Sequence, residues 1–218
     1  MRGDLQFPPL TNNEFKSQAM PSFLEVFNLP CPFVAPFTPR MASRIVIYCE
    51  VYPHAELLDP IIEVASNMGD KGFYFAFTEE YNVDGIWYLC YPGLSGKELY
   101  LKTWFIPFDK VKDYQGQTFL TNHVLYSPQG KWGLYMSTEH FLLIGGIPEF
   151  VSKIKQRIPN LDELTHQFLE DQKWRHLFLH SGIEWVPKFL DHVYGSEITQ
   201  RLLDEHGLND TLQGKITK

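Results

Sequence analysis

The sequence is poor in cysteine and contains no long hydrophobic run. Its three cysteines, Cys31, Cys49 and Cys90, lie far apart, and no two of them form a Cys-x-x-Cys pair. An odd number at this spacing argues against a disulfide framework and against a zinc knuckle, and it is typical of thiols in the reducing cytoplasm. No segment approaches the roughly 18 consecutive apolar residues of a membrane-spanning helix, and the first ten residues lack the apolar core of a secretory signal. We therefore expect a cytoplasmic protein with no membrane partner.

Basic residues are also scarce. The 218 residues include 19 Lys and Arg against 26 Asp and Glu, a formal net charge of −7. Because nucleic-acid binding relies on Lys and Arg contacts to phosphates, this balance argues against a nucleic-acid partner. Residues 93–97 (Gly-Leu-Ser-Gly-Lys) have only two residues between their glycines, and Glu98 stands where a Walker loop needs Ser or Thr. We therefore predict no cofactor.

Aromatic residues are abundant, at 15% of the chain. The first 40 residues alone hold 7 of the 15 prolines and 6 of the 17 phenylalanines. The prolines of residues 30–39 exclude a regular helix and a central strand, although the Phe and Val residues between them are apolar. We predict that residues 1–43 form an extended arm lying over the rest of the domain. The alternative is an apolar surface that a partner covers.

Residues 44–146 carry a series of strand signals. Short apolar or alternating runs occupy residues 45–51, 72–78, 85–91, 99–105, 118–126, 132–137 and 141–144. The Asp84-Gly85 step and residues 127–130 (Ser-Pro-Gln-Gly) favour tight hairpin turns, so we expect a mostly antiparallel sheet of about five to seven strands. One helix is predicted within this region, over residues 56–68.

Residues 147–207 show helical spacing. Helices are predicted to begin near Pro148, Leu161, Pro187 and Ser196, and the second of them carries Phe178 on its apolar stripe. The segment 208–218 resembles a frayed tail. The chain is therefore expected to be a single α+β domain over residues 44–207, with helices packed on one side of the sheet and a helical C-terminal third.

Most of the net charge lies in one segment. Between residues 56 and 84, seven acidic residues face a single lysine, a net charge of −6. Such a run is often a solvated surface, but it also favours a basic protein partner, because complementary charge speeds encounter. The candidate partner-binding residues are Glu56, Asp59, Glu63, Asp70, Glu79, Glu80 and Asp84.

Two further groups of residues are candidates for a site. Trp87, Trp104 and Trp132 are candidates to line an aromatic pocket for a small ligand. His176, His180 and Glu184 are four residues apart and would share one helix face, as metal ligands do, but Gly182 is expected to end the helix before Glu184. The metal site is therefore only an alternative to two surface histidines. Three other histidines near predicted strand ends are weak catalytic candidates: His54, His123 and His140.

One part of the chain resembles a known class of protein. Its motifs are Ser-Pro-Gln-Gly-Lys-Trp-Gly at residues 127–133, Ser-Thr-Glu-His-Phe at 137–141, Ile-Gly-Gly at 144–146, and Phe150. The order of these motifs, within residues 74–190, resembles that of bacterial immunity-type proteins encoded beside secreted toxins, and of their uncharacterised relatives. The resemblance implies a non-enzymatic binding protein that neutralises a toxin, and it carries over no catalytic residue.

Three functions are therefore open. The leading hypothesis is a cytoplasmic protein-binding module, an immunity-like inhibitor whose acidic surface binds a basic toxin. The second is an enzyme or small-ligand-binding protein that uses the aromatic pocket. The third is a structural subunit of an oligomer, in which the Phe-rich arm packs on another chain.

Overall fold

The fold is built on an antiparallel sheet. The structure, a computed structural model, describes residues 8–28, 35–50, 55–78, 80–81, 87–88, 103–112 and 122–212. Within these ranges six strands lie in the order β1-β8-β7-β6-β2-β5, and every neighbouring pair is antiparallel. The strands are β1 Ser43–Tyr48, β2 Gly72–Phe77, β5 Thr103–Pro107, β6 His123–Tyr126, β7 Trp132–Ser137 and β8 Phe141–Gly146. A separate two-stranded ribbon joins β3 Glu80–Tyr81 to β4 Trp87–Tyr88. The predicted α+β class is confirmed.

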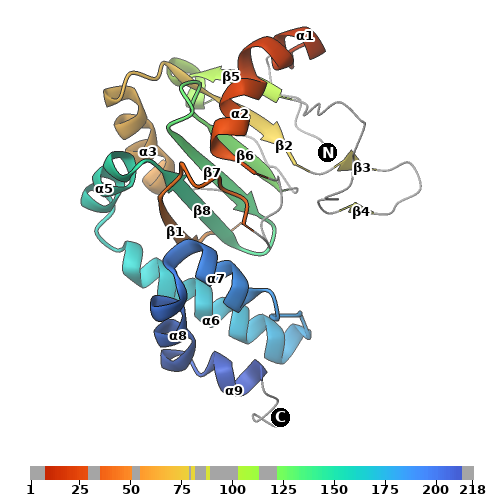
Figure 1. The fold of residues 1–218 in the computed structure, drawn as a ribbon, viewed down its shortest axis with the longest axis vertical. Helices are drawn as coiled ribbons and strands as arrows, with labels where there is room; N and C mark the ends of the chain where they lie inside the picture. Colours follow the sequence, from red (N-terminus) through yellow and green to blue (C-terminus); the bar gives the residue numbers. More distant parts are fainter. Residues whose placement is uncertain are drawn as a thin grey trace.

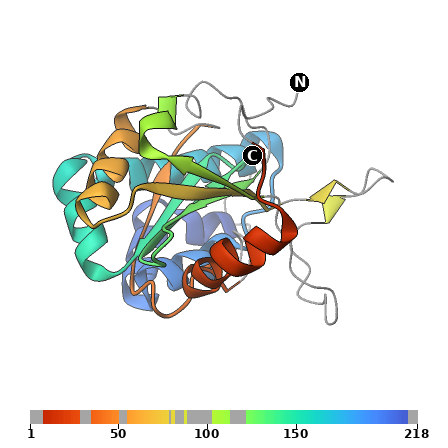
Figure 2. The same ribbon diagram turned by 90° about the horizontal axis from the view of Figure 1, so that it is seen from above.

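Helices cover both faces of this sheet, whereas one covered side was expected. Successive strand residues point to opposite faces, and in β2 both sets are apolar. Phe73 and Phe75 enter a core shared with α3 Ala55–Asn67 and α5 Pro148–Arg157, while Tyr74 and Ala76 enter a second core on the other face. Figure 2 shows α3 and α5 grouped together, away from the N-terminal helices. A sheet without a polar face needs a cover on each side.

The second core is closed by the C-terminal helices, which lie below the sheet in Figure 1. They are α6 Leu161–Leu179, α7 Val186–Tyr194, α8 Ser196–Glu205 and α9 Leu208–Leu212. Thr165 and Tyr194 bond to the backbone of Val46, and so satisfy polar groups of the edge strand β1. The tail predicted from residue 208 instead begins as a short helix, because Leu208 is buried against this core.

The N-terminal segment is largely helical, which corrects the expected extended arm. It forms α1 Asn12–Glu14, a π-helical stretch η1 Phe15–Ala19 and α2 Met20–Val26. Thr11 and Glu14 bond reciprocally in a capping box, a sequence signal that marks a helix start. Phe27, directly after α2, has extended backbone and forms an antiparallel bridge with Phe37. Both rings are buried in the second core, so this part does lie over the sheet as predicted.

Candidate functional site

Asp70, one of the candidate partner-binding residues, is a buried structural residue. Its side chain is only 5% exposed. Its carboxylate accepts hydrogen bonds from Ser127 Oγ at 2.8 Å, Gln129 Nε2 at 2.9 Å and Trp132 Nε1 at 2.8 Å. These bonds connect the segment just before β2 to the turn between β6 and β7 and to the first residue of β7. The expectation that Asp70 belongs to an acidic surface is therefore wrong.

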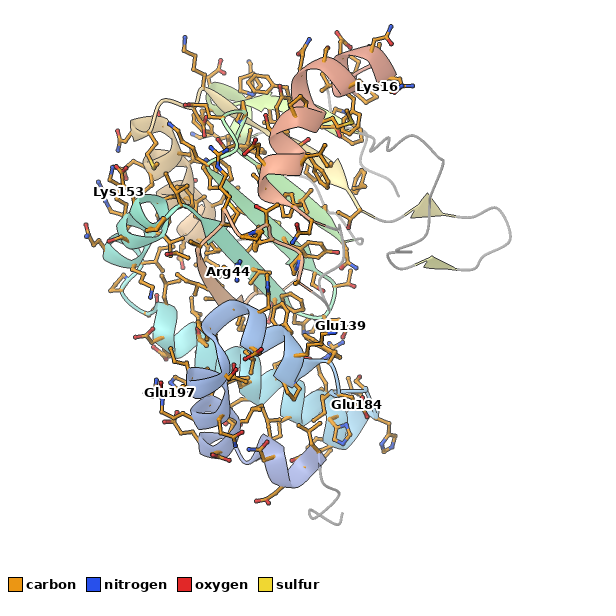
Figure 3. All side chains as sticks on the ribbon, viewed as in Figure 1. Lys16, Arg44, Glu139, Lys153, Glu184 and Glu197 are labelled. Atoms are coloured by element: carbon orange, nitrogen blue, oxygen red, sulfur yellow. The ribbon has the colours of Figure 1, made fainter. Side chains whose placement is uncertain are left out.

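Of the three acids on α3, Glu63 faces a cation on the neighbouring helix α5. Glu56, Asp59 and Glu63 are exposed, but Arg157 Nη1 on α5 lies 2.8 Å from the Glu63 carboxylate. A hollow of about 230 Å³ between these two helices is lined by Val64, Asn67, Lys153, Gln156 and Arg157, and Figure 3 shows Lys153 at this outer edge of α5. The surface around α3 thus carries both signs of charge. Glu79, Asp84 and the side chain of Glu80 lie outside the described residues.

The tryptophans belong to the core rather than to a shared pocket. Trp132 is 1% exposed and stacks on Phe150 with ring centroids 5.4 Å apart. Trp104 is buried too, 5.5 Å from the ring of Phe75. Their strands, β7 and β5, are separated by β6 and β2, which places them about 14 Å apart. Trp104 and Trp132 therefore do not line a common pocket. The side chain of Trp87, the third residue of the expected pocket, lies outside the described residues.

The predicted histidine candidates are dispersed. His176 Nδ1 donates to the carbonyl of Ser181 at 2.8 Å, and His180 ends α6 in a left-handed conformation with φ 56°. The helix thus ends before Gly182, and Glu184 does not continue its face. Over the described part of the chain, no three His, Cys, Asp or Glu residues are placed to hold a metal ion. His123 is buried, with its ring 5.3 Å from Phe75, and His54 lies outside the described residues.

A polar network holds the turn between β7 and β8 against α6. Arg175 forms a salt bridge with Glu139, whose carbonyl accepts from Gln172 Nε2 at 2.9 Å. His140 Nδ1 lies 3.6 Å from Asp171 Oδ1. Burial raises the pKa of the Asp171 carboxyl, against the opposing effect of His140 and Arg175. Sequence reasoning identified only His140 here, because its partners lie more than 30 residues further along the chain.

The possible nucleophiles beside this network have structural roles. Burial raises the pKa of the Cys49 thiol to about 12, so the thiol stays protonated and is a poor nucleophile. Ser137 Oγ accepts the backbone N–H of Glu139 at 3.1 Å, which fixes the start of the turn. The arrangement therefore serves to fix the C-terminal half of α6 to the sheet.

Part of the exposed surface at the C-terminal end of α6 is apolar. Trp174, Phe178 and Leu179 are 50%, 66% and 54% exposed, and the two rings are in contact with centroids 5.6 Å apart. With roughly 200 Å² for a whole aromatic side chain, the three together expose about 300 Å², which matches the largest apolar patch of a typical monomer. We call these three residues the α6 patch.

The sequence pattern placed Phe178 on the buried stripe, and the structure shows why this was wrong. A helix of 19 residues is about 28 Å long. The last buried residue in α6 is Gln172, so the final two turns extend beyond the core. The angular position predicted for Phe178 around the helix axis was right, but the hydrophobic core ends before the helix does. One sequence signal could have revealed the patch: aromatic and aliphatic residues lie close to the predicted end of the helix, and no predicted strand is available to cover them.

Comparisons with known proteins leave the site to be judged on its geometry. No family model matches the chain, and neither a curated protein nor a solved structure shows significant similarity to it. Within the described ranges, every helix is too short or too polar to cross a lipid bilayer.

Proposed function

We propose that this chain is a protein-binding module whose contact surface is centred on the α6 patch. The observation that carries the proposal is the exposure of Trp174 and Phe178, two touching aromatic rings, beside Leu179. Tryptophan is among the residues that contribute most to protein interfaces. The bonds from Arg175 and Gln172 to Glu139 hold this half of α6 in place, which lowers the entropy lost when a partner binds.

The charges around the patch favour a basic partner. Lys173 Nζ donates to the carbonyl of His206 at 2.8 Å, and Arg175 is paired with Glu139, so both cations are held within the protein. Glu184 is exposed, and Figure 3 places it on the side where α6 ends. The proposed partner therefore carries Lys or Arg around an apolar anchor. The resemblance to immunity-type proteins supports a basic toxin in the cytoplasm as that partner.

The experiment compares two variants in a pull-down from the source organism, followed by mass spectrometry. Wild type and the double variant Trp174→Ala/Phe178→Ala are used as bait, and Leu24→Ala is the matched control. Leu24 is 53% exposed on α2, so this control removes an exposed apolar side chain elsewhere. We expect a basic protein that binds wild type and Leu24→Ala but not the double variant, with direct binding then measured by calorimetry.

Other outcomes would contradict the proposal. Equal recovery of every partner by the double variant would show that the patch is not the contact surface. Loss of a self-associated species in the double variant, seen by analytical ultracentrifugation, would instead identify the patch as the interface of an oligomer.

A further inference from the structure

Two histidines and a carboxylate form a hydrogen-bonded chain between α6 and the α8–α9 turn. His206 follows α8 and has a side chain only 8% exposed. Its Nδ1 lies 2.7 Å from Glu170 Oε1, and its Nε2 lies 2.7 Å from Nδ1 of His166. Glu170 and His166 are both on α6, one turn apart. The chain of contacts Glu170–His206–His166 therefore connects α6 to the turn between α8 and α9.

The partners determine where the protons sit at neutral pH. An ionised carboxylate only accepts hydrogen bonds, so Nδ1 of His206 must carry a proton and donate it to Glu170. The neutral His206 ring then has only Nε2 left as an acceptor. His166 must consequently donate its Nδ1 proton to that atom. The observed geometry thus requires one defined tautomer in each ring.

The same geometry limits how many further protons the pair accepts. One more proton fits on the outward Nε2 of His166, because that residue is exposed and its Nδ1 still donates. A second one would have to sit on His206 Nε2, where two N–H donors and two positive rings would face each other across 2.7 Å. An opened pair has no such restriction, so it binds one proton more than the closed pair.

We propose that Glu170, His206 and His166 form a pH-responsive latch, which holds the α8–α9 segment on α6 at neutral pH and releases it as both histidines take up protons. Histidine is the side chain that ordinarily changes charge between pH 5 and 8. Since the open form binds one proton more once both of its histidines are charged, the opening equilibrium then rises by up to tenfold for each further unit by which the pH falls. Opening then competes with the burial of Leu202, Leu203 and Leu208.

Other charged groups also lie at this junction. Lys173 Nζ donates to the backbone carbonyl of His206, not to its ring. Asp204 accepts from Gln200 and Asn209, and these bonds lower the pKa of its carboxyl. Glu205 lies 3.8 Å from Arg201 on the same helix. The remaining charged residues nearby are Asp162 and Glu163 on α6 and Asp210 on α9.

The proton positions are read directly by NMR, and the release by hydrogen exchange. With ¹⁵N-labelled wild type at pH 7.5, we expect His206 to carry its proton on Nδ1. Exchange rates for peptides within residues 196–212, divided by the intrinsic rate at each pH, should rise as the pH is lowered from 7.5, by up to tenfold per pH unit. Peptides within residues 132–146 should not change, because the latch does not touch β7 and β8.

His166→Gln is the decisive variant, and His180→Gln is its control. A glutamine at position 166 can accept from a protonated His206, so we expect the acid-induced exchange of residues 196–212 to disappear. His180 is exposed and outside the chain of contacts, so His180→Gln should respond like wild type. The proposal is overturned if His206 carries its proton on Nε2 at pH 7.5, if wild type shows no acid-dependent exchange there, or if His166→Gln responds as wild type does.

Discussion

Removing the Asp70 carboxylate should destabilise the protein by an amount that depends on what replaces it. A hydrogen bond to a charged group contributes about 1.5–3 kcal/mol, compared with about 0.5–1.5 kcal/mol for a neutral pair. Asp70→Asn keeps an oxygen toward Ser127 and Trp132 but loses the charge on two buried bonds, so we expect a loss of about 2 kcal/mol. Asp70→Ala leaves Trp132 Nε1 without its acceptor and deprives Ser127 Oγ of the bond to Asp70. This should cost about 3–5 kcal/mol.

Urea unfolding followed by circular dichroism measures both losses as shifts of the midpoint at constant slope. The Asp70→Ala loss should also lower Tm by about 10 °C, because 1 kcal/mol corresponds to about 2–4 °C at this chain length. Glu56→Gln is the control, since it removes an exposed carboxylate from the same acidic segment and should change stability by less than about 0.5 kcal/mol. A loss below about 1 kcal/mol for Asp70→Ala would refute the structural role of Asp70.

Three further predictions follow from other contacts. A Cβ at Gly145 would lie 2.6 Å from the ring of Phe37, so Gly145→Ala should cost about 1–3 kcal/mol by overpacking, measured by urea unfolding. Burial, reinforced by a neighbouring guanidinium, lowers the pKa of His192 to about 4. Between about pH 6.5 and pH 4 the unfolded chain therefore binds a proton on His192 that the folded chain does not bind. The free energy of unfolding is consequently highest above about pH 6.5 and falls as the pH is lowered toward 4. Because the ring is only half-buried, the loss should be about 1–2 kcal/mol, and unfolding of His192→Gln across this range should lack it. The exposed ion pair of Glu63 with Arg157 should contribute less than about 1 kcal/mol, so Glu63→Gln should leave the midpoint almost unchanged.

Those elements whose signals are local could be predicted from the sequence. The strand expected over residues 132–137 has these same bounds in the structure, because the Ser-Pro-Gln-Gly turn before it and the Ser-Thr-Glu turn after it are set by neighbouring residues. The helix expected over 56–68 is observed as Ala55–Asn67, since its apolar spacing and the following Gly69 are again local signals. Periodicity and turn chemistry were sufficient for these elements.

The N-terminal segment was misjudged because composition outweighed a local signal. Dense prolines at 30–39 indicated extended backbone, but the capping box of Thr11 and Glu14 starts helices that run to Val26. The place where this segment packs was not predictable either. Phe37 fits above the paired Gly133 and Gly145, where any Cβ on the glycines would meet an aromatic ring. A glycine in a strand indicates close approach, but it does not say which distant ring approaches.

The candidate site was harder to predict, because a sequence shows which residues are charged but not which distant residues they contact in the fold. Seven acids between residues 56 and 84 predicted one surface, yet Asp70 is buried by partners 57 to 62 residues away, and Glu63 is paired with an arginine 94 residues away. The same long-range geometry determines the surface of α6. Its N-terminal half is covered by β1 and α7, so Phe168 is buried, whereas its C-terminal half is fixed through Arg175 and leaves Trp174 uncovered. An apolar residue on a helix is therefore a core residue only where another element reaches it. Since the network at Glu139 holds this uncovered half in place, its exposure is a property of the folded state, and a partner is the element we propose to cover it.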